Sequence, residues 1–187
     1  MDAIKITALL LILGNMLIVT GFGAFPSRIY TGKNVQGKLD LLIAMPRRWV
    51  FSQLLVILGG LVLIAGSFFL ALLFIKSQGI LPAWIGALGF VFGQIFWIWI
   101  VGLRIVEPWR QAKDEFPDWL YKTFSILTLL GLASFGVAFW LQGMQRVLGA
   151  GIFLGALLIL SLFLKLKSIP PITYYVLTLA IGLTLLF

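Results

Sequence analysis

The chain has 187 residues, of which 61% are hydrophobic and only 11% are charged, and its formal net charge is +8. Soluble domains average roughly 45–50% apolar and 25% charged residues, so this composition excludes an ordinary soluble fold. The chain contains neither Cys nor His. Disulfides, thiolate nucleophiles, histidine bases and metal sites built on either residue are therefore excluded as well.

Apolar stretches of the length needed to cross a bilayer, about 20 residues, recur along the chain. We predict an all-α, polytopic membrane protein that forms a single domain over residues 1–187, with six transmembrane helices in three antiparallel hairpins. The predicted spans are residues 6–25, 50–75, 81–103, 120–141, 147–164 and 170–187. The last span is short, and its opening Pro170 and Pro171 suit a first helical turn, where amides have no helical partner.

The first stretch also resembles a signal peptide, because an apolar core is followed by the small residues Gly21, Gly23 and Ala24. Cleavage there would leave the most basic connector of the chain outside the cell. That outcome conflicts with the distribution of positive charge described next, so we predict a retained span.

Lys and Arg are concentrated in every second connector. Eleven of the 14 lie in or next to three segments, whereas only Lys5, Lys76 and Arg146 lie on the other side. The three basic segments are residues 26–49, 104–119 and 165–169. Because cytoplasmic loops carry the excess of Lys and Arg, we predict that these segments are cytoplasmic and that both termini are outside.

Tryptophans at the predicted interfaces agree with this orientation. They form an aromatic belt with Trp49, Trp109 and Trp119 inside and Trp84 and Trp140 outside. Basic residues at the inner ends are expected to contact anionic lipid headgroups, namely Arg47, Arg48, Lys165 and Lys167. Nucleic acid is not an expected partner, because the basic connectors are short and carry no recognisable binding module.

The first cytoplasmic connector contains an apolar run, residues 39–45, that is too short to span a membrane. Two interpretations stay open at this point. The run forms an interfacial helix, or it extends the second span with a kink at Pro46.

Between the predicted interfaces there is no Asp, Glu, Lys or Arg. A charge at the bilayer centre costs about 2.5–3.5 kcal/mol and is retained for function, so this pattern argues against a proton-coupled transporter and an intramembrane acid/base enzyme. Neutral polar and deep aromatic side chains remain as candidates for pairing helices or contacting a ligand. They are Asn15, Gln94, Trp97, Trp99, Thr128 and Thr178. We favour helix pairing.

Glycines four residues apart predict close helix contacts. Gly89 and Gly93 have this spacing in the third span, and Gly151 and Gly155 have it in the fifth. Small residues at such positions let two helix backbones approach closely within a membrane.

These observations favour a non-catalytic protein without a cofactor. We predict an accessory or scaffold subunit of a bacterial or archaeal plasma membrane that packs against lipids and against other membrane subunits or further copies of itself. The alternative is a small-solute channel or facilitator, not coupled to protons, with Asn15 and Gln94 facing its path. A lipid-modifying enzyme using Glu107, Arg110 and Asp114 is a third, less favoured hypothesis.

Overall fold

The structure is a computed structural model that describes residues 2–143, 145–166 and 169–187. Within these ranges the chain is all-helical and contains no strand. Five of the described helices are long and apolar enough to cross a membrane, which confirms the predicted class. They are α1 (Ala3–Gly23), α4 (Pro46–Leu72), α5 (Ile80–Val106), α7 (Asp118–Gln142) and α8 (Arg146–Leu166).

The sixth predicted span is shorter than expected. Helix α9 covers Ile172–Leu186, 15 residues, which amounts to about 22 Å at 1.5 Å per residue. The hydrocarbon core of a bilayer is about 30 Å thick, so α9 falls short of the full span by length alone. Its start is set by the prolines, because Pro170 and Pro171 have no amide hydrogen and instead accept bonds from Thr173 and Tyr174.

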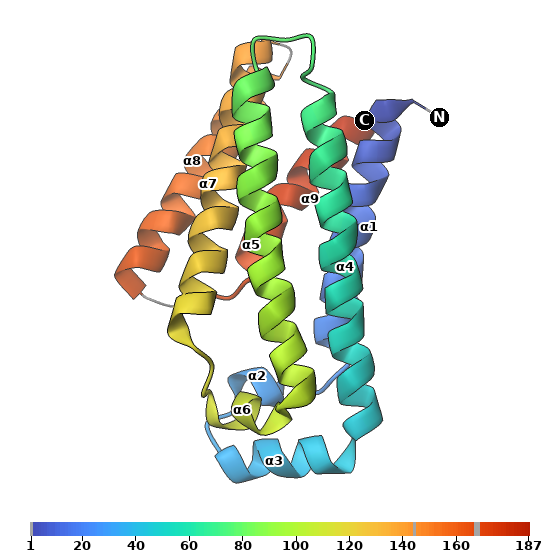
Figure 1. Cartoon of the computed structure of the whole chain (residues 1–187), viewed down its shortest axis with the longest axis vertical. Helices are drawn as coiled ribbons and strands as arrows, with labels where there is room; N and C mark the ends of the chain where they lie inside the picture. Colours follow the sequence, from blue (N-terminus) through green and yellow to red (C-terminus); the bar gives the residue numbers. More distant parts are fainter. Residues whose placement is uncertain (1, 144, 167–168) are drawn as a thin grey trace.

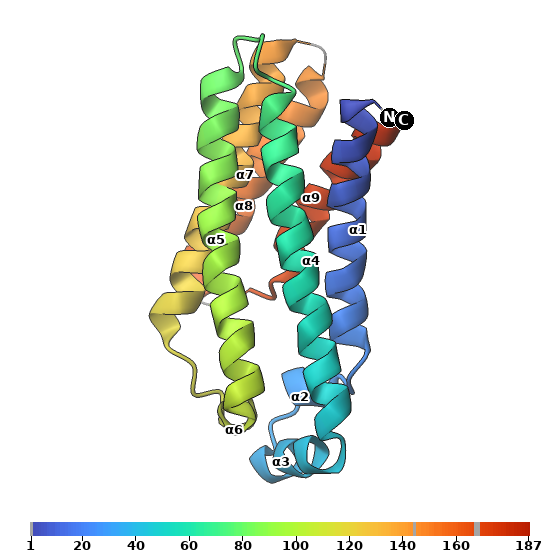
Figure 2. The ribbon, with the colours of Figure 1, turned by 45° about the vertical axis from the view of Figure 1, so that its right-hand side comes forward.

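Neighbouring helices pack in the order α1, α4, α5, α7 and α8, and α9 lies mainly against α1 with weaker contacts to α8 and α7. Helix α1 packs against α4, and α5 packs against α7. The predicted arrangement in three hairpins is not confirmed, because α8 packs mainly against α7 at the edge of the bundle, whereas α9 packs mainly against α1 (Figures 1 and 2). Polar side chains on α9 explain this choice, since they pair with α1, α5 and α7 as described below.

Three short helices form a cap at the end of the bundle opposite both termini (Figures 1 and 2). They are α2 (Arg28–Thr31), α3 (Val35–Ala44) and α6 (Pro108–Lys113). Helix α3 is separate from α4, because Met45 leaves helical geometry (φ −135°, ψ 53°) and Pro46 opens α4. The predicted loops 26–49 and 104–119 are therefore largely helical, and residues 39–44 belong to α3.

The cap has an apolar core of its own. It is formed by Phe25, Ile29, Leu42, Trp49 and Ala112. Trp49 is only 2% exposed, packs edge-on against Phe25 at 5.1 Å between ring centroids, and donates from Nε1 to the Arg104 carbonyl at 2.9 Å. The prediction of Trp49 as an interfacial belt residue is thus wrong, because α2 and α3 cover it.

Candidate functional site

Asn15 and Thr178 form a buried polar pair that joins α1 to α9. Asn15 Nδ2 donates to Thr178 Oγ1 at 3.0 Å and to the carbonyl of Leu11 at 2.7 Å. The hydroxyl of Thr178 is also 2.9 Å from the carbonyl of Tyr175. Two residues that the sequence analysis selected separately are therefore brought together, 163 positions apart in the chain.

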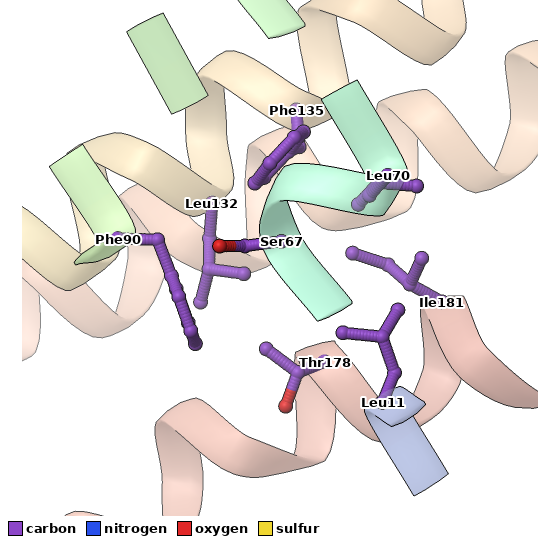
Figure 3. Close-up of a pocket in the computed structure, with 8 residues that line it drawn as sticks. All are labelled: Leu11, Ser67, Leu70, Phe90, Leu132, Phe135, Thr178 and Ile181. Carbon is purple, nitrogen blue, oxygen red and sulfur yellow. The ribbon is translucent and has the colours of Figure 1, made fainter. Parts of the chain in front are cut away.

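A small cavity lies next to this pair. Figure 3 shows its lining, in which Leu11 of α1, Ser67 of α4, Phe90 of α5 and Thr178 of α9 approach one another. Its volume is about 10 Å³, which is about what one water molecule requires. Apolar carbon makes up nearly all of its lining, and the Ser67 hydroxyl donates to the Ile64 carbonyl on its own helix at 2.8 Å. The cavity is too small for an organic solute.

Gln94 and Trp97 lie on one face of α5 and are both fully buried. Gln94 Oε1 accepts a hydrogen bond from the Tyr175 hydroxyl of α9 at 3.3 Å. The Trp97 ring stacks on Phe124 of α7, with 4.9 Å between centroids. Gln94 Nε2 and Trp97 Nε1 have no hydrogen-bond partner in the described part of the chain. The interior of the bundle therefore contains donors without acceptors at this level.

Arg104, in the last turn of α5, belongs to the same face. Its Cζ lies 5.0 Å from the centroid of the Trp97 ring and 5.5 Å from that of Phe116. Side chains of a helix point back toward its N-terminus, which brings the guanidinium to a tryptophan seven residues earlier. Arg104 Nε and Nη1 are buried and have no partner among residues 2–143, 145–166 and 169–187. A cation thus reaches the aromatic interior.

Trp99 has a different environment from Trp97. It is 50% exposed on the outside of α5, where it meets Trp119 of α7 edge-on at 5.9 Å and stacks near Phe96 at 6.4 Å. Exposed indoles of this kind suit the membrane interface. Of the two deep tryptophans predicted as candidates for helix pairing or ligand contact, the structure therefore places only Trp97 inside the bundle.

The glycines of α5 lie against α7. A Cβ added at Gly93 would overlap Thr128 Oγ1 and lie 3.0 Å from the Thr128 nitrogen, and one added at Gly89 would lie 3.2 Å from the Gly131 Cα. A Cβ added at Gly86, which the sequence analysis did not select, would lie 2.9 Å from the Gly131 carbonyl oxygen. Backbone-to-backbone contact of this kind needs residues without side chains.

The two glycines predicted on α8 differ from each other. A Cβ at Gly155 would lie 3.1 Å from Leu177 Cδ2 of α9, whereas one at Gly151 would meet no described atom within 4 Å. A groove of about 360 Å³ runs between α7 and α8. It is lined by Gly136, Val137, Trp140, Gly149, Ala150, Phe153 and Leu154. Gly151 therefore lies on an open surface of the bundle.

Three of the four predicted headgroup residues lie on the surface. Arg47, Arg48 and Lys165 are exposed, and Arg48 Nε donates to the carbonyl of Ala24, which ties α4 to the end of α1. Lys167 lies outside the described residues.

The charged side chains of the cap form local ion pairs. Lys38 of α3 lies 2.9 Å from Asp114, which follows α6, and Arg110 pairs with Glu107 three positions earlier. The residues of the third hypothesis, a lipid-modifying enzyme, are therefore divided between two separate pairs.

Several buried polar residues escaped the sequence analysis. Tyr174 donates to Ser125 of α7 at 3.0 Å, and Gln53 of α4 donates to the hydroxyl of Tyr30 at 3.2 Å. Tyr174 and Gln53 lie close to predicted helix ends, where polar residues are common and give little signal. Arg104 could have been found, because positions 94, 97, 101 and 104 share one helical face.

The chain matches no protein-family model, no curated protein and no solved structure.

Proposed function

We propose that the protein is a non-catalytic accessory or scaffold subunit of a bacterial or archaeal plasma membrane. In this proposal α1, α4, α5, α7, α8 and α9 all lie in the membrane, both termini are outside, and the cap of α2, α3 and α6 faces the cytoplasm. The partners are other membrane subunits or further copies of the chain, together with the surrounding lipid.

The observation that carries the proposal is the open glycine on α8. Lipid tails adapt to any apolar side chain, whereas an approaching helix benefits from small residues at the contact. Gly151 is exposed, a Cβ added there would meet no described atom of another element within 4 Å, and Leu154, one turn further along α8, is 63% exposed. A helix of a partner subunit fits this surface better than a lipid tail does.

The interior supports the subunit hypothesis over the facilitator. Asn15 and Gln94, which would face a permeation path, instead bond Thr178 and Tyr175 of α9. The cavity next to Thr178 has a volume of about 10 Å³. This arrangement favours the interpretation that Asn15 and Gln94 hold helices together.

Gentle solubilisation of the tagged full chain from its source membrane tests the proposed role. We expect the wild type to migrate with a defined larger complex and Gly151→Leu to migrate as the isolated chain. Gly102→Leu is the matched control, since a Cβ at Gly102 also meets nothing described within 4 Å but lies on α5. Loss of the complex in both variants, or in neither, would contradict a docking role for Gly151.

Cysteine labelling tests the orientation, because the chain has no Cys of its own. In intact cells, Cys in place of Lys33 or Lys113 should be shielded from an impermeant thiol reagent, and Cys in place of Gln78 should react. The opposite sidedness would overturn the orientation. Cys in place of Phe187 should react as well, and protection there would show that α9 does not complete a sixth span.

A further inference from the structure

We propose that Arg104, with the indole of Trp97, forms a binding site for a phosphate-type anion, either the headgroup of an anionic lipid or free phosphate. The site lies near the cap at the end of α5, where Arg104 is half-buried and its Nε and Nη1 are enclosed. It is independent of the docking surface on α8, so the two proposals can fail separately.

Unpaired donors mark the site. Arg104 Nε and Nη1 and Trp97 Nε1 are all buried without a partner in the described segments of the chain. All three atoms are hydrogen-bond donors, and the guanidinium and the indole have no acceptor at all. This face of α5 therefore calls for a group that only accepts hydrogen bonds, which is the chemistry of an ionised oxyanion.

Positive charge at the site is also uncompensated. None of the ion pairs among the described residues includes Arg104. Asp114 is close enough to interact with it through space, but its Oδ2 lies 2.9 Å from Lys38 Nζ. Water could satisfy the N–H groups, yet it would leave the charge unbalanced in surroundings of low polarity. An anion satisfies both requirements.

Aromatic residues hold the guanidinium in place. Trp97 and Phe116 lie on it at 5.0 and 5.5 Å, and Trp97 is fixed in turn by stacking on Phe124. Such contacts orient an arginine without using its hydrogen-bond donors. The planar fork of donors is thereby kept available for a bidentate contact with phosphate oxygens.

Thermal unfolding of the full chain, purified in a neutral detergent and freed of bound lipid, tests the site. One arm compares inorganic phosphate with chloride at equal ionic strength. The other compares dioleoylphosphatidylglycerol with dioleoylphosphatidylcholine in mixed micelles. At an anion concentration about 100 times its Kd, the unfolding temperature of the wild type should rise by roughly 5–10 °C.

Arg104→Gln should lower the affinity for the anion at least about tenfold, which is the range expected for the loss of hydrogen bonds to a charged group. Arg28→Gln is the matched control, because it removes an exposed arginine of the cap at the same end of the bundle and should leave the shift unchanged. A response to phosphatidylglycerol alone identifies a lipid headgroup as the ligand, whereas a response to both identifies a site open to free phosphate.

Trp97→Phe supplies a second readout if Arg104→Gln does not fold. Anion binding should change the tryptophan fluorescence of the wild type, and most of that change should disappear in Trp97→Phe while a thermal shift persists. The proposal is overturned if neither anion stabilises the wild type, or if Arg104→Gln and the wild type respond alike.

Discussion

Helices α5 and α8 both carry glycines four residues apart, yet the structure uses them differently. On α5, Gly89 and Gly93 are both covered by the backbone of α7. On α8, a Cβ added at Gly155 would meet only the end of the Leu177 side chain, and one added at Gly151 would meet no described atom within 4 Å. The same spacing thus marks a completed helix contact in one place and an open surface in the other.

This difference separates two roles for small residues in a membrane bundle. The α5–α7 contact is part of the fold, because no side chain fits between the two helices. On α8, a side chain at position 151 would meet no described atom of another element within 4 Å, so a partner outside the chain is the proposed reason for a glycine there. Substitutions on α5 should therefore destabilise the fold, whereas substitution of Gly151 on α8 should detach a partner and leave the fold intact.

Gly93→Leu should have the largest effect. Its first side-chain atom already overlaps Thr128 Oγ1, and Thr128 N lies 3.0 Å away, so α5 and α7 must separate. We expect a loss of about 3 kcal/mol in unfolding free energy, at the upper end for overpacking. Thermal unfolding of the purified chain measures it. A variant that melts like the wild type would show that the α5–α7 contact is not tight.

Gly155→Leu should have an intermediate effect. The nearest atom to an added Cβ is Leu177 Cδ2 at 3.1 Å, and a leucine side chain can turn aside where a backbone cannot. A cost of about 1 kcal/mol, or roughly 2–4 °C in unfolding temperature, is expected. If Gly155→Leu proved as harmful as Gly93→Leu, the distinction between backbone and side-chain contacts would be lost.

Asn15→Leu and Gln94→Leu should each lower the unfolding free energy by less than Gly155→Leu does. They remove bonds to Thr178 and Tyr175, and hydrogen bonds between membrane helices average about 0.6 kcal/mol. Both variants should keep the fold and any assembly, as judged by gel filtration and thermal unfolding. A selective collapse of solute flux in reconstituted Gln94→Leu, with unchanged stability, would instead favour the facilitator.

Gly151→Leu should leave the stability of the isolated chain unchanged, because a Cβ there contacts none of the described residues within 4 Å. The comparison is sharpest when its unfolding temperature is measured beside that of Gly93→Leu in the same detergent. A clear destabilisation of the isolated Gly151→Leu chain would show that this position belongs to the fold rather than to a docking surface.

The sequence was sufficient to predict the helical class and most of the long apolar helices, because hydropathy over 20 residues is a strong local signal. It also gave Asn15 and Thr178 as polar candidates, but their pairing could not be predicted, since it depends on how α9 packs against α1. Glycine spacing is likewise a local signal, and it does not show whether another helix lies against the glycines. The sequence pattern at Gly93 and at Gly151 is therefore the same, although only Gly93 is covered.

Arg104 shows the same limit in a different way. As a cation next to a predicted span, it was counted only as a sign of orientation. Its contact with Trp97 depends on the direction of a long side chain along the helix, and the lack of a described counter-ion depends on Asp114 pairing with Lys38. Neither can be seen in a count of charges by connector.

Photo-crosslinking in intact membranes tests the proposed docking surface most directly. A photoreactive residue in place of Leu154, 63% exposed beside Gly151, is compared with one in place of Ile85, 53% exposed on α5. We predict one discrete protein adduct from position 154, lost when Gly151→Leu is added, and none from position 85. Equal crosslinking at both positions, or only lipid adducts at position 154, would contradict a subunit docked on α8.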